Sequence, residues 1–270
     1  MNLKRKLIFN TSALRYFVYT FIWSILFWGL AYIFGGDDSS SSILFYVGGA
    51  GPFVIAILLT LFKENTETKR DFWIRIIDIK RIRWPWLFAS LILHPILILI
   101  AFLIDGGLGG AFPGMSQQLS SITSIFSFLF FVFLLGPFPE EIGWRGFALD
   151  RLQLQMSAVK ASLILGGIWA LWHVPLFFIP GTFQSEVMGL GTLRFWIFLF
   201  SNIPLSIIMA WVYNNTNRST LSVALIHFSG NVFGALYLKS DRVALLELLL
   251  LIIFAIFIAS KYGLDEGSVH

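Results

Sequence analysis

The chain has 270 residues, of which 57% are hydrophobic and only 13% are charged. A soluble domain carries about 25% charged residues, so a chain of this length has too little polar surface to fold as a water-soluble globule. The composition therefore excludes an ordinary cytosolic domain, a disordered chain and a nucleic-acid-binding module, and the net charge of +4 is typical of basic loops beside a membrane. Because there is no cysteine, disulfides, thiolate metal sites and a cysteine nucleophile are also excluded.

Eight apolar stretches have the length of about 17–25 residues that a transmembrane helix needs. Turn-forming and polar residues separate them, and the sequence has no internal repeat or second domain. It therefore predicts an all-α polytopic membrane protein with one domain over residues 1–270. The predicted spans are residues 14–34, 43–62, 84–104, 122–138, 161–179, 195–213, 221–238 and 243–259.

The distribution of basic residues predicts the orientation of these spans. Sixteen of the 19 lysines and arginines lie in the N-terminal segment, in the loops after the second, fourth and sixth spans and in the C-terminal tail, whereas three lie in the opposite loops. Basic residues concentrate in cytoplasmic loops, so we expect both termini in the cytoplasm. The most basic loop, residues 63–83, carries Phe72, Trp73, Ile76 and Ile77 at helical spacing. We expect an amphipathic helix on the cytoplasmic membrane surface there, with a solvated linker as the alternative.

Two glutamates stand at the end of the fourth span, and ionisable side chains inside a membrane are costly and usually functional. Glu140 and Glu141 follow Gly136-Pro137-Phe138-Pro139, in which the prolines end one helix and suit the start of another. Acidic residues in a first helical turn are also favoured by the helix dipole, so a simple helix start is the alternative explanation. Arg145 lies one turn after Glu141, so we expect these two to pair and leave Glu140 to point elsewhere.

Histidines occur within three other predicted spans. His173 lies in the fifth span, and His227 and Asn231 lie four residues apart on one face of the seventh. Hydrogen bonding to a neighbouring helix is the structural alternative for each. Together with Glu140, however, they can meet in the cytoplasmic half of one bundle, which predicts an intramembrane polar site open to the cytoplasmic side. His94, in the third span, has no companion motif, and we interpret it as structural.

One carboxylate and two imidazoles without a serine or cysteine partner favour chemistry with an activated water molecule. A glutamate can take a proton from water, a histidine can orient that water, and an asparagine amide can donate a hydrogen bond to a tetrahedral oxyanion. Glu140, His173 and His227 also match the two-histidine, one-glutamate ligand set of catalytic zinc, although from three separate segments. Zinc is therefore the alternative to a site without a cofactor.

In this order and in these spans, the residues resemble the type II CAAX prenyl endopeptidases, which belong to an intramembrane protease superfamily with the bacteriocin-processing proteins. The motifs are Glu140-Glu141-x-x-x-Arg145, Trp169-x-x-x-His173 and His227-x-x-x-Asn231, within a core of about residues 137–234. One departure is Trp169, because the second motif of the family usually begins with phenylalanine. A large aromatic group is kept, so we expect this change to alter packing rather than chemistry.

The resemblance implies a role for each motif residue. Glu140 and His173 would activate water, and His227 and Asn231 would form the oxyanion hole. Glu141 and Arg145 would support the site through their mutual pairing, and no metal or other cofactor would be needed.

The resemblance also implies a substrate, a farnesylated or geranylgeranylated C-a-a-X protein that is cleaved after the modified cysteine and loses its last three residues on the cytoplasmic side. The expected partners are this prenylated protein or peptide and membrane lipid, with no nucleic acid. One alternative keeps the superfamily and changes the substrate to an unprenylated leader peptide or membrane segment. Another is a proton-coupled transporter with Glu140 and the histidines as a relay, although no inverted repeat is evident.

Overall fold

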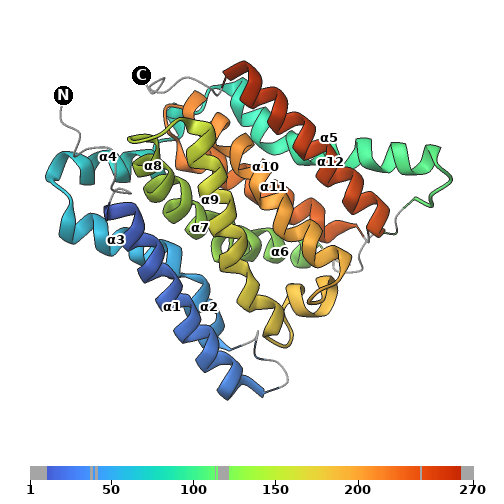
Figure 1. Cartoon of the computed structure of the whole chain (residues 1–270), viewed down its shortest axis with the longest axis horizontal. Coiled ribbons are helices and arrows are strands. Elements are labelled where there is room, and N and C mark those ends of the chain that lie inside the picture. The colour runs from blue at the N-terminus through green and yellow to red at the C-terminus, as the bar shows by residue number, and fades with distance from the viewer. Residues whose placement is uncertain are drawn as a thin grey trace.

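In a computed structural model, all regular elements of the described residues are helices (Figure 1). The structure describes residues 11–36, 39, 42–112, 114, 122–237 and 239–262. The long helices are α1 (Thr11–Gly35), α5 (Trp84–Gly107), α6 (Ile122–Leu135), α9 (Ala158–His173), α10 (Leu193–Asn215), α11 (Thr220–Leu236) and α12 (Asp241–Tyr262). The shorter elements are α2 (Ile43–Gly49), α3 (Gly51–Lys63), α4 (Thr66–Ile77), η3 (Ile79–Arg81), α7 (Pro137–Gly143), η5 (Trp144–Leu149), α8 (Asp150–Gln153), η6 (Val174–Phe178) and η7 (Gln184–Met188).

The all-α polytopic architecture predicted from hydropathy is confirmed. Six helical segments of the described chain are long and apolar enough to cross a membrane, and the bent pair α2–α3 makes a seventh if it counts as one span. The remaining predicted span, the seventh in chain order, corresponds to α11, which is apolar but shorter. The bend between α2 and α3 is 53° and falls at Ala50, directly before the Gly51-Pro52 start of α3, where proline suits a new helix.

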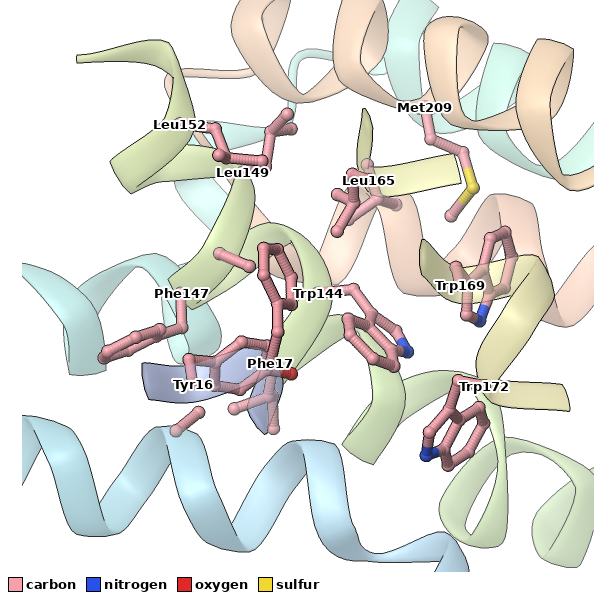
Figure 2. Close-up of a cluster of buried hydrophobic side chains, with 14 of the residues drawn as sticks. Tyr16, Phe17, Trp144, Phe147, Leu149, Leu152, Leu165, Trp169, Trp172 and Met209 are labelled. Carbon is pink, nitrogen blue, oxygen red and sulfur yellow. The ribbon is translucent and has the colours of Figure 1, made fainter. Parts of the chain in front are cut away.

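The helices pack around one large core of aromatic and aliphatic side chains, with two smaller hydrophobic clusters beside it. Helix α10 packs against α9 and α12, α11 packs against α5 and α7, and α3 packs against α7. Figure 2 shows Trp144, Trp169 and Trp172 on one side of this core and Tyr16, Phe17 and Phe147 on the other. The start of α1, helix α4, helix α8 and the end of α12 lie along one edge of the bundle (Figure 1).

Helix α4 forms where the amphipathic helix was predicted, and its four apolar residues divide between the surface and the protein interior: Trp73 and Ile77 are exposed. Phe72 and Ile76 are buried in the protein core, where α4 packs against α11, α3 and η5. Arg75, between them, is also buried and bonds to the backbone carbonyl of Gly146 and to Tyr213. Sequence periodicity shows which face of a helix is apolar but not whether protein or lipid covers it.

A close approach between helices places α7 in the middle of the bundle. A Cβ atom on Gly143 would overlap the Tyr16 hydroxyl of α1 and the Pro52 carbonyl of α3. Only glycine lets both helices pass this near. The consequence is that Glu140 and Glu141, one turn earlier on α7, lie inside the protein rather than on its rim.

Candidate active site

The polypeptide changes direction between α6 and α7, and this change positions both glutamates. Helix α6 ends at Leu135, Gly136 adopts a non-helical conformation, and Pro137 opens α7. Proline suits this first helical position because it has no N–H to leave unsatisfied. The helix then continues into η5, a π-helical turn from Trp144 to Leu149, and such turns are frequent at functional sites.

Glu141, Arg145 and His227 form a buried chain of hydrogen bonds. The Arg145 Nη1 atom donates to both carboxylate oxygens of Glu141, at 2.9 and 3.0 Å, and both side chains are 0% exposed. The Nδ1 atom of His227, from α11, lies 2.9 Å from Glu141 Oε1. The pairing predicted between Glu141 and Arg145 is thus confirmed, and Glu141 additionally orients the imidazole of His227.

Glu140 has a different environment from its neighbour. Its carboxylate accepts one hydrogen bond, 2.9 Å from Trp169 Nε1 to Oε2, and this is its only side-chain hydrogen bond within the described part of the chain. Arg145 is engaged by Glu141 and makes no ion pair with Glu140. Because successive residues of a helix point about 100° apart, the two carboxylates project in different directions, as the sequence predicted.

Hydrogen bonding fixes the imidazole of His173 in one orientation. Its Nδ1 atom lies 2.8 Å from the backbone carbonyl oxygen of Trp169 on the same helix, α9. A carbonyl can only accept, so Nδ1 carries the proton and Nε2 keeps a free lone pair. The ring is almost fully buried between Trp169, Trp172 and Phe198.

Asn231 lies one turn beyond His227 on α11 and faces the start of α7. Its Nδ2 atom lies 3.8 Å from the position that a Cβ atom on Gly136 would occupy, and its side chain is exposed. The small residues between His227 and Asn231 allow α5 to approach. Ser229 donates a 2.7 Å hydrogen bond to the Leu91 carbonyl, and the His94 ring packs directly on Gly230.

Trp169 is the residue through which the separate motifs meet. Its indole N–H bonds Glu140 and its carbonyl bonds His173. Its ring lies 4.4 Å from the Arg145 guanidinium carbon and 5.1 Å from the centre of the His227 ring. The tryptophan therefore changes the hydrogen bonding of the site as well as its packing, which corrects the expectation that packing alone would change.

Two comparisons with known proteins bear on this arrangement. Residues 122–233 match the family described as "Type II CAAX prenyl endopeptidase Rce1-like". The chain is also 30% identical over 253 residues to "CAAX prenyl protease 2" of Methanococcus maripaludis, an alignment that covers 91% of this chain and 93% of the relative. This chain belongs to the Rce1-like type II CAAX prenyl endopeptidase family. The family resemblance seen in the motifs is thereby confirmed.

As a member of this family of intramembrane CAAX proteases, the chain carries all three motifs inside the matched segment, which runs from α6 to α11. A cavity of about 260 Å³ adjoins that segment. It opens between the α2–α3 bend and the α6–α7 turn. Pro139 lines it, and Glu140 is the next residue in the chain. The lining of the cavity is almost entirely apolar and consists of Tyr46, Ala50, Phe53, Leu134, Leu135, Phe138 and Pro139.

The zinc alternative needs three ligands close together. Over the ranges that the structure describes, no group of three or more histidine, aspartate or glutamate side chains has the geometry to hold a metal ion. Glu140 and His173 are joined through Trp169 rather than directly, and His227 gives its Nδ1 to Glu141.

Proposed function

We propose that this family member is an intramembrane endopeptidase that cleaves prenylated C-a-a-X proteins after the modified cysteine and releases the last three residues. The observation that carries the proposal is the position of Glu140. Its carboxylate is held by one neutral donor, and the residue before it in the chain, Pro139, lines an apolar cavity. A carboxylate that is not consumed by an ion pair is available for proton transfer, and the name of the Methanococcus relative describes a prenyl protease.

In the proposed reaction, Glu140 takes a proton from a water molecule whose oxygen attacks the scissile carbonyl carbon. The free Nε2 atom of His173 orients that water. Asn231 donates a hydrogen bond to the oxygen that becomes negatively charged, as an oxyanion hole does. His227, whose Nδ1–H is held by Glu141, donates to the same oxygen from Nε2 in its doubly protonated, imidazolium form. The proton then passes from Glu140 to the leaving amine nitrogen as the C–N bond breaks, which restores the carboxylate.

The apolar cavity supports a lipidated substrate. Its lining residues come from the α2–α3 bend and from the α6–α7 turn, which ends one residue before Glu140, so an apolar chain that occupies it would bring its attached peptide toward that glutamate. Burial of a prenyl chain contributes about 0.8 kcal/mol per CH₂ group, whereas an unmodified tripeptide tail gains no such binding. Prenylated protein and lipid are accordingly the proposed partners.

The orientation proposed for the chain places both termini in the cytoplasm. It rests on the excess of basic residues on one side. It agrees with the arrangement in Figure 1, in which the start of α1, the basic helix α4 and the end of α12 share one edge. Because the chain has no cysteine, single cysteines introduced at Lys69 and at Lys239 would report sidedness directly. We expect a reagent on the cytoplasmic side to label the cysteine at position 69 and a reagent on the opposite side to label the cysteine at position 239.

The test of the activity uses the purified protein in detergent with two peptides, a farnesylated C-a-a-X sequence and its unmodified twin, and mass spectrometry of the products. We expect loss of three C-terminal residues from the farnesylated peptide alone. Equal cleavage of both peptides would favour an unprenylated substrate, and cleavage of neither would contradict the proposal. A strong chelator should leave cleavage unchanged, and loss of activity that zinc restores would replace the mechanism with a metal-dependent one.

A further inference from the structure

We propose that Trp169 is a positioning residue for the Glu140 carboxylate, so that its indole N–H, and not only its ring, sets the rate of the reaction. This inference rests on the proposed function, in which Glu140 is the base. The observation behind it is that the indole donates the one side-chain hydrogen bond that Glu140 makes within the described ranges. The phenylalanine expected at this position from the family pattern has no donor to replace it.

The hydrogen bond gives the two oxygens of the Glu140 carboxylate different roles. Oε2 accepts from the indole at 2.9 Å, which leaves Oε1 to face a water molecule. Without the bond, the carboxylate would rotate about its terminal torsion, which has a broad energy profile. Holding a reacting group in one orientation reduces the entropy loss on reaching the transition state.

The indole itself is held rigidly. Trp169 is only 2% exposed, its ring stacks on the Arg145 guanidinium and its edge contact with His227 fixes the other side. Its backbone carbonyl at the same time holds His173 Nδ1. One residue therefore sets the position of Glu140 through its side chain and of His173 through its backbone, and these are the two groups proposed to hold the water.

The hydrogen bond from the indole also favours the ionised form of the Glu140 carboxylate. The titratable groups that face it are Glu141 and Arg145 on its own helical segment, His227 on α11 and Tyr16 on α1, with His173 on α9 joined through Trp169. Arg145 is already paired with Glu141, so the indole is the direct donor to the Glu140 carboxylate. A donor to the ionised form favours that form, and its removal should move the acid limb of the pH–rate profile to higher pH.

The decisive variants are Trp169→Phe and replacement of Trp169 by 3-benzothienylalanine, which keeps the two-ring shape and has sulfur in place of the N–H. We expect kcat to fall about 10- to 100-fold in both, the range for a lost hydrogen bond to a charged group. KM should stay within about twofold, with the acid limb shifted as stated. The matched control is Trp28→Phe, because the Trp28 indole is equally buried but donates to the Phe45 carbonyl rather than to a site residue, and its ring reaches the site only through Trp172. Its kcat should not change.

The opposite results would overturn the inference. A benzothienylalanine variant with wild-type kcat would show that the ring alone matters. A rise in KM at constant kcat would assign Trp169 to substrate packing instead.

A measurement independent of activity separates this inference from the proposed function. With ¹⁵N-labelled tryptophan in detergent, the Trp169 indole resonance is assigned from its disappearance in Trp169→Phe. Glu140→Gln should move this resonance upfield and leave that of Trp28 in place, and an unmoved Trp169 resonance would refute the hydrogen bond. If the wild type cleaves no farnesylated peptide, the proposed function fails while the resonance still decides on the bond. If the wild type cleaves and Trp169→Phe matches it, the function stands and the inference fails.

Discussion

Two clusters of charged and polar groups lie inside this bundle, and they are built in opposite ways. The α4 cluster consists of Asp71, Arg75, Asp150, Tyr213 and Arg218. Arg75 bonds Asp71 at 2.8 Å and Tyr213, and lies 3.6 Å from Asp150. Arg218 in turn pairs with both Asp150 and Asp71. Each of the four charged side chains in this cluster has two opposite charges beside it.

The site cluster consists of Glu140, Glu141, Arg145, Trp169, His173 and His227. Among the described residues, Glu141 pairs with Arg145 and with His227, Arg145 pairs with Glu141 alone, and the Glu140 carboxylate accepts its one hydrogen bond from the neutral indole. Two Arg145 nitrogens, Nε and Nη2, have no hydrogen-bond partner in the described portion of the chain. We call a cluster saturated when every charge in it has an oppositely charged partner. A saturated cluster stabilises a fold, whereas a carboxylate without such a partner is available for chemistry.

The electrostatics of the α4 cluster follow from its saturation. Burial disfavours the charged form of Arg75, yet Tyr213, Asp150 and Asp71 together raise the pKa of Arg75 above its ordinary value. Arg75 also donates to the Gly146 carbonyl at 3.0 Å, and Arg151 donates to the Phe147 carbonyl at 3.0 Å. Both carbonyls belong to η5, so the saturated cluster fixes the helical segment that follows the two glutamates.

The largest effect that this comparison predicts comes from Glu140→Gln. The change removes the proposed base and keeps the shape of the side chain, so cleavage of the farnesylated peptide should fall by about 10²–10⁴-fold. No ion pair is broken, so the unfolding free energy in mixed micelles with dodecyl sulfate should stay within about 1 kcal/mol of the wild type. A variant that is folded and fully active would remove Glu140 from the mechanism.

The next effect is expected at Asn231, which makes no side-chain hydrogen bond to the described residues. If its amide stabilises the oxyanion, Asn231→Ala should lower kcat by about 10²–10³-fold, the cost of one such donor. Stability should change little because the side chain is exposed. Asn215→Ala is the matched control, since Asn215 is also exposed and bonds only the Trp211 carbonyl. Equal kcat in both variants would contradict the role of Asn231.

Glu141→Gln tests the other half of the site cluster by its effect on folding. It leaves the fully buried Arg145 without its carboxylate and takes a partner from His227. Breaking a buried ion pair on one side costs about 3–5 kcal/mol, so the unfolding free energy should fall by that amount. An unchanged unfolding free energy would mean that Glu141 and Arg145 are not a buried pair. The expected loss would instead show that the two glutamates differ in kind, Glu140 acting on rate alone and Glu141 on stability.

Part of this site follows from the sequence alone and part does not. The Glu141–Arg145 pair and the shared face of His227 and Asn231 depend on positions within one helix, where spacing determines geometry. The Trp169–Glu140 bond joins side chains of α9 and α7 that are 29 residues apart in the chain, and local patterns do not encode such a contact. The packing of Phe72 and Ile76 of α4 against protein was missed for the same reason, because either lipid or protein can cover an apolar face.

The smallest effect is expected at Asp150, and it distinguishes the two clusters most directly. Asp150→Asn removes one carboxylate from the α4 cluster, but Arg75 keeps Asp71 and Tyr213, and Arg218 keeps Asp71. Because no buried charge is left alone, the loss should be about 1 kcal/mol of unfolding free energy, well below that of Glu141→Gln, with kcat unchanged. The double variant Asp71→Asn/Asp150→Asn should cost more than the sum of the single changes, since only then does Arg75 lose its last carboxylate. If the loss of unfolding free energy in the double variant equals the sum of the two single losses, the two aspartates do not substitute for each other. Redundant ion pairing would then no longer explain why the α4 cluster takes no part in the reaction and the site cluster does.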